Sequence, residues 1–592
     1  GHNVPISNML HHYVITEPVQ ALIDLEPELP VVRDPYSHCY LREETHGLLI
    51  GPYETSGAHT CFDEGIAWDF ESELVTPELD RLLPWLEKAT ERMPLFAEAG
   101  VKSVISGAIT HTPDGNFLLG RAPGPNNYWM ACGAAIGICQ GAGAGKYLAQ
   151  AMVHGDAEIN LLEFDPARFG EWATPEYTRV KSIEDYEAMY RCLAPGEQHE
   201  GGRPVRTSSV YDKLQARGAQ FQQVMGWERA RWFDAAGDGE RFSFRRSNWW
   251  DAVAAECKAV RERVGLMDLS TFAKYDVTGV NGEQFLNRVC ANKCPRRAGG
   301  IVLGHLLSEN GRIDGEVTIT RFADDHFYVL SAAFAQLRDL SRLRNSMAAS
   351  EDVSIVDVTD DRGTLVLAGP RSREVLAVLT DTELGNEQFR WLSGRTITVA
   401  GIDDVRCLRV NYVGELGFEL HAPMASMAHL FDALVEAGEP HGLALFGAYA
   451  MNSLRLEKAY RGMGSELTAE ITMVEADMDR FVGWGKEDFV GKAATQRSKQ
   501  EGPRIQLVYL AVDAKDADCI GNEPVYADGE LTGITTSGGY GFATAQSLAF
   551  AYVEPAYVQP GTELEIDVLG QRIGARVIEQ PVYDPQNLRL RA

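Results

Sequence analysis

The sequence lacks any long hydrophobic run. Its most continuous apolar stretch, residues 128–139, is about a dozen residues long, whereas a membrane-spanning helix needs roughly 20. It also lacks an excess of positive charge, because 84 acidic residues outnumber 55 basic residues and the formal net charge is −29. Such a surface repels phosphate backbones and anionic lipid. We therefore expect a soluble protein whose main partner is neither a nucleic acid nor a membrane.

Cysteines are few and scattered. The ten cysteines include one close pair, Cys290 and Cys294, and no second pair of cysteines or histidines stands at zinc spacing. This usage argues against a disulfide framework and a structural zinc site, and it fits a reducing compartment. No leader peptide is visible after Gly1, so we expect a bacterial cytoplasmic protein, with the mitochondrial matrix as the alternative.

The length of the chain and the order of its helix, strand and turn signals predict several domains. At roughly 100–200 residues per domain, the 592 residues correspond to about three to five domains. Apolar residues recur at helical spacing over residues 79–95, which predicts an amphipathic helix covering a sheet formed by the preceding β-type runs. Further helices are expected over 251–264 and 448–458, and the final β-rich segment carries hairpin-like turns at 528–529 and 537–539. The expected fold class is an α+β or α/β multidomain protein, with domains at residues 1–162, 163–240, 241–495 and 496–592.

A glycine-rich run at residues 133–145 is predicted to lead from a strand into a helix through a loop with few side chains. A phosphate-binding loop needs glycine five residues before its Gly-Lys pair and Ser or Thr after it, but Gln140 and Tyr147 occupy these places. The run also departs from the G-x-G-x-x-G fingerprint of dinucleotide-binding units. Two interpretations stay open: close packing of glycines, or a flat ligand pressed against bare backbone.

Two groups of polar residues are candidates for chemistry. His11, Tyr40 and Arg42 carry ionisable groups near the first predicted sheet, although a strand histidine is commonly a core or edge residue with satisfied hydrogen bonds. Asp314 and Glu316 stand just before an apolar strand, where one carboxylate could face a pocket and the other solvent. A solvated turn is the alternative interpretation of this second group.

The segment at residues 412–419 is rich in polar and aromatic side chains. In a regular strand, alternate residues of this segment would point to opposite faces. Its two glycines, Gly414 and Gly417, favour a bend instead, so the local geometry stays open.

Several segments, taken in their order along the chain, resemble one enzyme family. They are residues 11–18 (HHYVITEP), 40–42 (YLR), 51–54 (GPYE), 112–115 (TPDG), 226–229 (GWER), 412–419 (YVGELGFE), 453–458 (SLRLEK) and 535–538 (TTSG). Together they resemble the dimethylglycine dehydrogenase and sarcosine dehydrogenase family of flavin- and folate-dependent oxidoreductases, over nearly the whole chain.

The resemblance implies an architecture and an activity. Residues 1–162 would be the substrate half of a glycine-oxidase-type FAD domain, 163–240 a linking module, 241–495 an aminomethyltransferase-type folate domain, and 496–592 a terminal β-barrel. The implied reaction is oxidative N-demethylation of dimethylglycine at FAD, with transfer of the one-carbon unit to tetrahydrofolate. Alternatives are a sarcosine dehydrogenase, a folate-dependent aminomethyl or methyl transferase with an inert flavin domain, and a non-catalytic folate-binding subunit.

The resemblance also implies roles for individual residues. On the flavin side, His11 and Tyr40 would bind and orient the amine, and Arg42 would pair with the substrate carboxylate. The flavin ring would be lined by Gly133, Ala135 and Gly137.

On the folate side, the resemblance assigns three residues. Glu316 would stand near the reactive nitrogens of the folate, where related domains usually carry Asp, and Tyr412 and Glu419 would hold the pterin.

One feature of the family is not found in the sequence. The family's flavin domain begins with a strand–GxGxxG–helix unit, and many members carry a histidine that links covalently to the flavin; neither is present here. We expect either a fragment of a longer protein or a separate chain that supplies this half. The electron acceptor would be oxygen or an electron-transfer flavoprotein.

Overall fold

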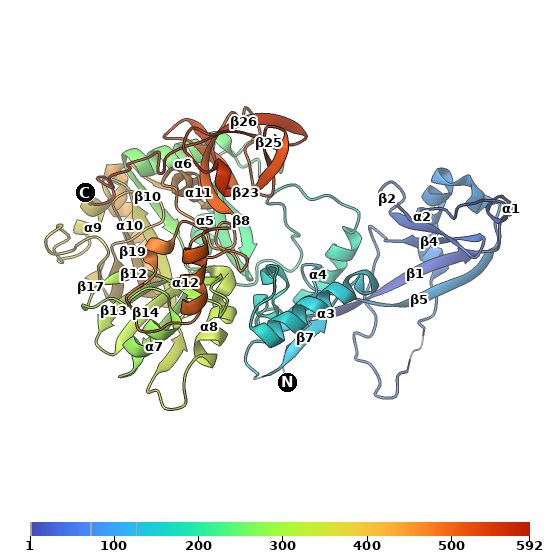
Figure 1. Ribbon diagram of the computed structural model, residues 1–592, viewed down its shortest axis with the longest axis horizontal. Helices are drawn as coiled ribbons and strands as arrows, with labels where there is room; N and C mark the ends of the chain where they lie inside the picture. The colour runs from blue at the N-terminus through green and yellow to red at the C-terminus, as the bar shows by residue number, and fades with distance from the viewer. Residues whose placement is uncertain (1–2, 72–73, 126) are drawn as a thin grey trace. The chain divides into compact units, whose positions relative to one another are not determined.

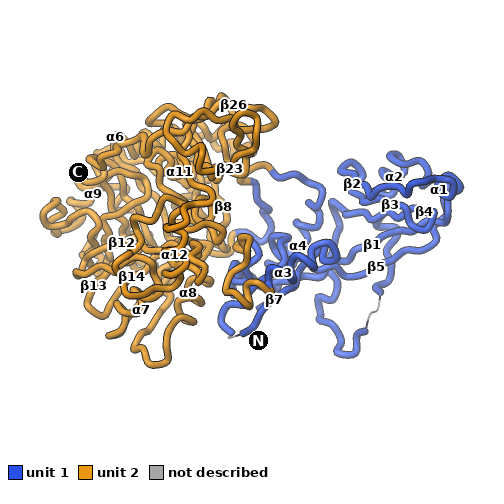
Figure 2. Tube along the Cα trace, viewed as in Figure 1, with its two compact units in different colours: residues 1–148, 163–193, 197–203 blue, residues 149–162, 194–196, 204–592 orange. Residues whose placement is uncertain are grey.

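The computed structural model describes residues 3–71, 74–125 and 127–592, and the chain forms two compact units (Figures 1 and 2). Unit 1 contains residues 1–148, 163–193 and 197–203, and unit 2 contains residues 149–162, 194–196 and 204–592. Within the described residues, no helix is both long enough and apolar enough to span a membrane.

The core of unit 1 is a five-stranded antiparallel sheet. Its strand order is β2-β3-β4-β1-β5, and the two longest strands, β1 and the edge strand β5, pair without a register shift over most of their length. The bounds are β1 (Ser7–Thr16), β2 (Val32–Asp34), β3 (Cys39–Glu44), β4 (Gly47–Pro52) and β5 (Val101–His111). These strands confirm the predicted β-type runs, in which β-branched and aromatic residues alternate with turn residues.

Helix α2 (Leu79–Arg92) confirms the predicted amphipathic helix, although not every apolar residue of the segment is buried. It buries Leu82, Trp85 and Ala89, whereas Leu83 is 47% exposed. Trp85 and Ala89 pack in the same apolar cluster as residues of β3 and β4. The large indole at position 85 therefore decides which stripe of the helix meets the sheet.

The remaining elements of unit 1 are short, apart from two helices. Helix α4 begins with Thr174 as an N-cap that accepts from the backbone N–H of Tyr177, and Pro175 occupies its first turn. This helix packs against β1. The bounds are α1 (Gln20–Ile23), α4 (Pro175–Glu187), the ribbon β6 (Leu118–Arg121) and β7 (Trp129–Cys132), and α3 (Gly137–His154), whose residues from 149 onward are counted with unit 2.

The glycine-rich run lies where a strand leads into a helix, as predicted, but most of it is helical. Gly133 follows β7 with a φ of +80°, and α3 begins at Gly137. The expected loop is therefore short, and Gly141, Gly143 and Gly145 lie inside the helix.

Unit 2 contains two larger sheets, a hairpin and a closed barrel. The first sheet has the order β17-β18-β19-β16-β10-β20, with bounds β10 (Val264–Asp268), β16 (Arg362–Ala368), β17 (Gly394–Val399), β18 (Ile402–Leu408), β19 (Gly417–Pro423) and β20 (Leu443–Leu445). The second has the order β12-β13-β14-β11-β15, with bounds β11 (Ala273–Thr278), β12 (Ile301–Leu307), β13 (Ile313–Ala323), β14 (His326–Ser331) and β15 (Ser354–Asp357). The hairpin is β8 (Ala219–Val224) and β9 (Trp227–Phe233).

Helices cover the sheets of unit 2. Helix α6 confirms the helix expected over 251–264, and α11 confirms the one expected over 448–458. Their bounds, with those of the other helices, are α5 (Tyr211–Gln215), α6 (Trp250–Glu262), α7 (Gly282–Val289), α8 (Gln336–Asn345), α9 (Ser372–Ala377), α10 (Met427–Gly438), α11 (Ala448–Glu457) and α12 (Lys492–Glu501).

The β-rich end of the chain closes into a barrel. Asp528 and Gly529 form the predicted hairpin turn, both with positive φ. The turn expected at 537–539 is wrong, because these residues lie inside β23 beside a bulge. The barrel strands are β21 (Gln506–Val512), β22 (Pro524–Ala527), β23 (Glu530–Gly541), β24 (Gln546–Val553), β25 (Glu563–Val568) and β26 (Gln571–Val577).

Candidate functional site

The structure brings His11 and Tyr40 together in unit 1. His11 lies on β1 and is 8% exposed, and its Nε2 is 3.0 Å from the hydroxyl of Tyr40 on β3. Its Nδ1 is 2.9 Å from the hydroxyl of Tyr186 on α4, and the ring of Tyr53 packs at 4.6 Å between centroids. Two of the residues implied by the resemblance are therefore hydrogen-bonded to each other inside an aromatic cluster.

A buried carboxylate stands behind this cluster. Glu54 is fully buried, accepts a hydrogen bond of 2.5 Å from Tyr186, and pairs with Arg81 of α2 at 3.2 Å. Arg81 also contacts Nδ1 of His12 at 3.2 Å. The sequence offered Glu54 only as part of the GPYE segment, and it gave no signal for Tyr186, which lies 175 positions after His11 in the chain.

The surroundings keep the His11 imidazole uncharged. Burial, helped by His12, His111 and Arg81, lowers the pKa of His11 to about 3. Burial also raises the pKa of Tyr40 and that of Tyr186, so both phenols keep their protons. At neutral pH the cluster therefore presents a neutral base flanked by two hydroxyl groups.

Space for the Tyr40 ring depends on a glycine. Gly51 faces Tyr40 across the β3–β4 pair, and a Cβ at position 51 would lie 1.9 Å from Cζ of Tyr40. Real carbon atoms cannot approach so closely, so only glycine at position 51 lets the tyrosine lie against β4 and reach His11.

Two arginines lie near the cluster. Arg42 is exposed on β3 and is paired with Glu44, so the structure does not bring it to His11. Arg33 faces Tyr40 across the β2–β3 pair, and its guanidinium lies 4.7 Å from the centre of the Tyr190 ring. Sequence reasoning missed Arg33. A predicted pairing of β2 with β3 would have placed it opposite Tyr40.

The predicted flavin-lining residues occupy the turn between β7 and α3. A Cβ at Gly133 would lie 2.7 Å from the side chain of Thr112, so close packing explains this glycine. Helix α3 buries none of its side chains and Ile138 is fully exposed. Added Cβ atoms at its glycines 141, 143 and 145 would meet nothing within 4 Å. Ala135 and Gly137 thus begin an open, apolar helix face that a flat ring could approach.

In unit 2, both candidate carboxylates lie inside β13, so the alternative of a solvated turn is wrong. Asp314 is held by Arg338 and Arg342 of α8. Oε2 of Glu316 is 3.2 Å from Nε2 of the buried His305 on β12, and the Glu316 side chain keeps 19% exposure. Glu316 is therefore the carboxylate that stays available to a ligand.

The other two predicted folate-site residues lie near the start of β19: Tyr412 precedes this strand and Glu419 lies inside it. Residues 412–416 form a bend, as their glycines suggested, and β19 begins at Gly417. The Tyr412 ring stacks on Tyr460 at 5.7 Å, and its hydroxyl donates to the carbonyl of Arg461. The charge of Glu316 contributes to the raised pKa of Tyr412, after burial, so these two predicted residues lie in one electrostatic environment.

Sequence reasoning missed a buried lysine near Glu419. Burial raises the pKa of Glu419 to about 8, an effect that Lys274 opposes, and burial lowers the pKa of Lys274 to about 7. Nζ of Lys274 donates to the carbonyls of Ser270 and Phe272 at 2.8 and 2.7 Å. Its position inside a β-strand pattern gave no sign that its charge acts on Glu419.

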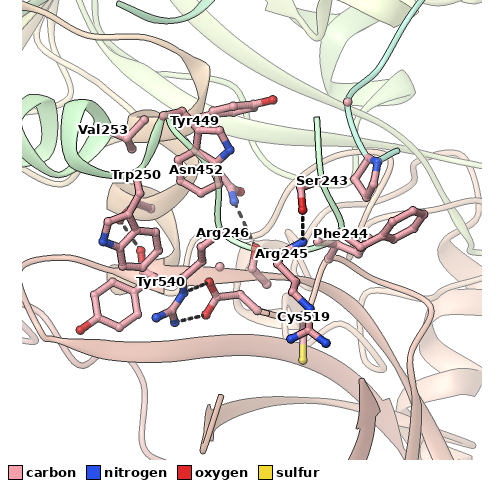
Figure 3. A pocket seen from close by; sticks show the side chains of 18 of the residues that line it. Ser243, Phe244, Arg245, Arg246, Trp250, Val253, Tyr449, Asn452, Cys519 and Tyr540 are labelled. Carbon is pink, nitrogen blue, oxygen red and sulfur yellow. Dashed lines mark hydrogen bonds and ion pairs between the residues drawn. The ribbon is translucent and has the colours of Figure 1, made fainter. Parts of the chain in front are cut away.

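A cavity of about 220 Å³ lies elsewhere in unit 2, between α6, α11 and the barrel strand β23 (Figure 3). The guanidinium of Arg246 lies there 4.2 Å from the ring centre of Trp250 and 4.7 Å from that of Tyr540, and it forms a two-point ion pair with Asp518. Asn452 donates to the carbonyl of Gly538. The described lining residues include none of the predicted site residues. No cluster of His, Cys, Asp or Glu among the residues that the structure describes is arranged to hold a metal.

Comparison with known proteins agrees with this arrangement. Residues 1–151 match the family "FAD dependent oxidoreductase", 154–208 its central domain, 210–486 the GCVT N-terminal domain, and 506–584 the glycine cleavage T-protein C-terminal barrel domain. Mitochondrial dimethylglycine dehydrogenase of Mus musculus is 36% identical over 601 residues, which cover 100% of this chain and 69% of the mouse protein. The chain belongs to the dimethylglycine dehydrogenase family. The predicted fold class, with an FAD domain, an aminomethyltransferase-type domain and a terminal barrel, is thereby confirmed.

Other relatives show the spread of the family. The formaldehyde-forming 4-methylaminobutanoate oxidase of Paenarthrobacter nicotinovorans is 32% identical, covering 100% of this chain and 71% of that protein. The glycine cleavage system aminomethyltransferase T of Bartonella henselae superposes with a TM-score of 0.56 at 24% identity, over 64% of this chain and 98% of that protein. This second likeness concerns the fold alone.

The cofactors of the family, FAD and tetrahydrofolate, fit the residues present. The open helix face of α3 offers bare backbone to a flat ring, and the neutral His11–Tyr40 pair offers hydrogen bonds without a competing charge. The carboxylate of Glu316 can accept from adjacent N–H groups, which the pterin edge carries, the carboxyl group of Glu419 can accept or donate because its pKa is raised to about 8, and stacked Tyr412 and Tyr460 offer an aromatic surface.

Proposed function

We propose that this protein oxidises one N-methyl group of N,N-dimethylglycine and transfers the resulting one-carbon unit to tetrahydrofolate. The products are sarcosine and 5,10-methylenetetrahydrofolate. The observation that carries this proposal is 36% identity to a dimethylglycine dehydrogenase along the whole chain, on which both the His11 cluster and the Glu316–Tyr412–Glu419 group lie.

The residues of unit 1 prepare the amine. FAD, when bound, accepts a hydride from the N-methyl carbon, and tetrahydrofolate, when bound, supplies the nitrogens that capture the one-carbon unit. Hydride leaves readily only when the neighbouring nitrogen has a free electron pair, so the amine must be neutral. Neutral His11, hydrogen-bonded to Tyr40, binds and orients the amine, and the burial that lowers the pKa of His11 to about 3 favours the neutral form of the amine in the same way. Arg42 or Arg33 binds the substrate carboxylate.

The residues of unit 2 hold the folate. Glu316 lies at the reactive nitrogens, while Tyr412 and Glu419 hold the pterin. His305 steadies Glu316 through the contact of 3.2 Å. In unit 1, Gly133, Ala135 and Gly137 line the flavin ring.

A change at Gly51 tests the placement of Tyr40. Gly51→Ala is expected to push the Tyr40 ring away from His11 and to slow flavin reduction by about 10²-fold, because a misplacement of about 1 Å has effects of this size. Stopped-flow absorbance of the flavin measures the rate. Gly100→Ala is the control, since the φ of Gly100 is not positive and a Cβ there would meet only Cγ of Glu17, at an ordinary contact distance of 3.5 Å. Equal rates for Gly51→Ala and the wild type would contradict the assigned position of Tyr40.

A change at Glu316 tests the folate site separately. Glu316→Gln keeps the size of the side chain but removes its charge, so flavin reduction by dimethylglycine should be unchanged while the yield of methylenetetrahydrofolate falls by about 10²-fold. Product analysis by mass spectrometry measures the yield. Glu309→Gln, in the exposed turn before β13, is the control. An unchanged yield in Glu316→Gln would remove this residue from the site.

The flavin spectrum tests the oxidase reaction and its alternatives. Anaerobic addition of dimethylglycine should bleach the flavin band faster than sarcosine or 4-methylaminobutanoate at equal concentration. Faster bleaching by sarcosine would make the protein a sarcosine dehydrogenase. A protein that performs folate-linked transfer without any flavin band would be an aminomethyl transferase with an inert flavin domain.

We further propose that the open face of α3 is covered by another part of the flavin domain, on the same or a separate polypeptide. The fully exposed Ile138 supports this proposal. Analysis of the purified protein for co-purifying chains tests it.

Electrons pass from the flavin to oxygen or to an electron-transfer flavoprotein, and oxygen uptake distinguishes these acceptors. All ten cysteines lie among the described residues and are free thiols, which supports a reducing compartment such as the bacterial cytoplasm.

A further inference from the structure

An unbroken series of polar contacts runs through unit 1 to His11. It begins at Arg81, passes to Glu54 at 3.2 Å and to Tyr186 at 2.5 Å, and reaches Nδ1 of His11 at 2.9 Å. It ends at Tyr40, 3.0 Å from Nε2 of His11. The contributing elements are β1, β3, the segment after β4, α2 and α4, so the series depends on the tertiary fold.

The buried ion pair determines which group donates and which accepts in each hydrogen bond of this series. Glu54 is fully buried and paired with Arg81, so its carboxylate only accepts hydrogen bonds. Tyr186 has a single hydroxyl proton and must donate it to Glu54. The oxygen of Tyr186 is then left to accept from Nδ1–H of His11.

The same count of donors and acceptors determines the protonation of the second ring nitrogen of His11, Nε2. A neutral imidazole carries one proton, so His11 with Nδ1–H has an unprotonated Nε2. That nitrogen accepts from the hydroxyl of Tyr40. We propose that Glu54 and Tyr186 are positioning residues that hold His11 as the Nδ1–H tautomer and direct its unprotonated Nε2 toward Tyr40.

The other polar groups around His11 do not compete for its nitrogens. His12 accepts from the backbone N–H of Glu78 at 3.1 Å and contacts Arg81, and His111 is paired with Asp185 at 2.8 Å. Tyr53 packs against the face of the ring. The charged and titratable groups that face His11 are therefore Glu54 and Arg81 through Tyr186, His12 on β1, His111 on β5, and the phenols of Tyr40, Tyr53 and Tyr186.

This arrangement matters for the proposed oxidation, on which its catalytic meaning rests. The tautomer makes Nε2 the acceptor of the Tyr40 hydroxyl proton, so the oxygen of Tyr40 is left to accept a hydrogen bond from the substrate amine without rotation of the His11 ring. The contact of Nδ1–H with Tyr186, and that of Tyr186 with Glu54, hold the ring in this orientation. A carboxylate that orients a histidine base in this way is a recurring device of hydrolases.

The experiment is nitrogen NMR of the full-length protein labelled with ¹⁵N in its histidines. The His11 signals are assigned by their loss in His11→Asn. In the wild type, Nδ1 is expected to be the protonated nitrogen and Nε2 the unprotonated one. In Tyr186→Phe, Nδ1 has no acceptor, so the Nε2–H tautomer, which can donate to Tyr40, is expected to predominate.

A matched pair on the surface supplies the control. The hydroxyl of Tyr36 donates to Glu91 at 2.8 Å in an exposed position, so Tyr36→Phe removes an equivalent Tyr–Glu contact without touching His11. It should leave the His11 signals unchanged. Glu54→Gln is the second variant, because an amide can donate or accept and should therefore produce a mixture of tautomers. An Nε2–H tautomer of His11 in the wild type would overturn the inference. So would the same His11 tautomer in the wild type, Tyr186→Phe and Glu54→Gln.

Kinetics separate this inference from the proposed function. In the flavin-loaded enzyme, Tyr186→Phe should lower the rate of flavin reduction roughly 10- to 100-fold, with KM for dimethylglycine changed less than about twofold. The tautomer measurement needs neither flavin nor substrate. If the tautomer changes as expected but dimethylglycine does not reduce the flavin, only the proposed function fails; turnover with an unchanged tautomer refutes only the present inference.

Discussion

Replacing His11 with alanine is expected to slow flavin reduction by dimethylglycine about 10²-fold or more, the usual effect of losing a group that positions the substrate. The variant removes both hydrogen bonds of the imidazole, to Tyr40 at 3.0 Å and to Tyr186 at 2.9 Å. The amine then loses the contacts that orient it and favour its neutral form, and the fraction of reactive free amine falls. Anaerobic stopped-flow absorbance of the flavin gives the rate directly.

The effect should be specific to this histidine and to this site. His429, which is exposed on α10 and bonded to the carbonyl of Ala400, provides the control variant His429→Ala with an expected wild-type rate. Raising the pH should partly restore the rate of His11→Ala, because more of the amine is then neutral in solution. A wild-type rate for His11→Ala at pH 7 would show that His11 has no part in the oxidation.

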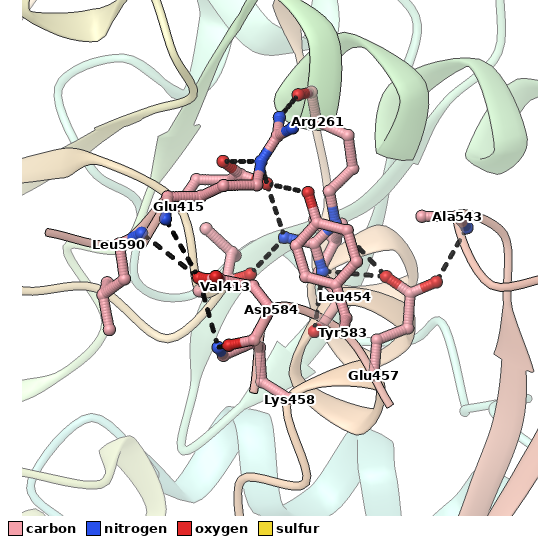
Figure 4. A network of polar contacts seen from close by, with 12 residues as sticks. Arg261, Val413, Glu415, Leu454, Glu457, Lys458, Ala543, Tyr583, Asp584 and Leu590 are labelled. Atoms are coloured by element: carbon pink, nitrogen blue, oxygen red, sulfur yellow. Dashed lines mark hydrogen bonds and ion pairs between the residues drawn. The ribbon is translucent and has the colours of Figure 1, made fainter. Parts of the chain in front are cut away.

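Replacing Arg261 with methionine is expected to have the largest effect on stability. Arg261 lies on α6, is nearly buried, and bonds two buried carboxylates: Glu457 at 2.8 Å and Glu415 at 3.2 Å (Figure 4). It also donates to the carbonyls of Val413 and Leu454. Removing one partner of a buried ion pair leaves the other charge uncompensated and costs about 3–5 kcal/mol.

The surrounding network compensates only one of the two charges, because Glu415 keeps its ion pair with Arg589, whereas Glu457 has no ion-pair partner other than Arg261 among the described residues. Glu415 is further bonded to Tyr583 and Arg589, and Lys458 donates to the carbonyl of Asp584, so the network joins α6 and α11 to the C-terminal segment (Figure 4). The unfolding transition of unit 2, followed by calorimetry, measures the change.

The control for this prediction is an exposed ion pair in the same unit. Arg245 and Asp516 are 48% and 65% exposed, so Arg245→Met should cost no more than about 1 kcal/mol. A loss in Arg261→Met as small as that in the control would show that the network does not stabilise unit 2.

Local patterns predicted most of the secondary structure, because helical and strand periodicity depend on nearby residues. Helices α2, α6 and α11 and the turn at Asp528 and Gly529 follow this rule. Ser537–Gly539 did not, because glycine there serves a close approach: a Cβ at Gly538 would lie 2.5 Å from the carbonyl oxygen of Cys519. Glycine in a strand and glycine in a turn look the same in a sequence.

The candidate site was predictable only in part. The resemblance indicated His11, Tyr40, Glu316, Tyr412 and Glu419, and the structure pairs the first two directly. It could not indicate Tyr186, which contacts His11 from a distant segment, or Lys274, whose charge acts on Glu419 of another strand. Nor could it show that Arg42 pairs with Glu44 while Arg33 faces Tyr40, because strand register decides which side chains meet.

The central claim is that one protein oxidises dimethylglycine and captures the one-carbon unit on folate. The most direct test measures formaldehyde and methylenetetrahydrofolate formed per dimethylglycine consumed, with and without tetrahydrofolate. We predict that formaldehyde accounts for the one-carbon unit without tetrahydrofolate, and that methylenetetrahydrofolate replaces most of it when tetrahydrofolate is present. Formaldehyde release that does not depend on tetrahydrofolate, or no consumption of dimethylglycine at all, would contradict the account.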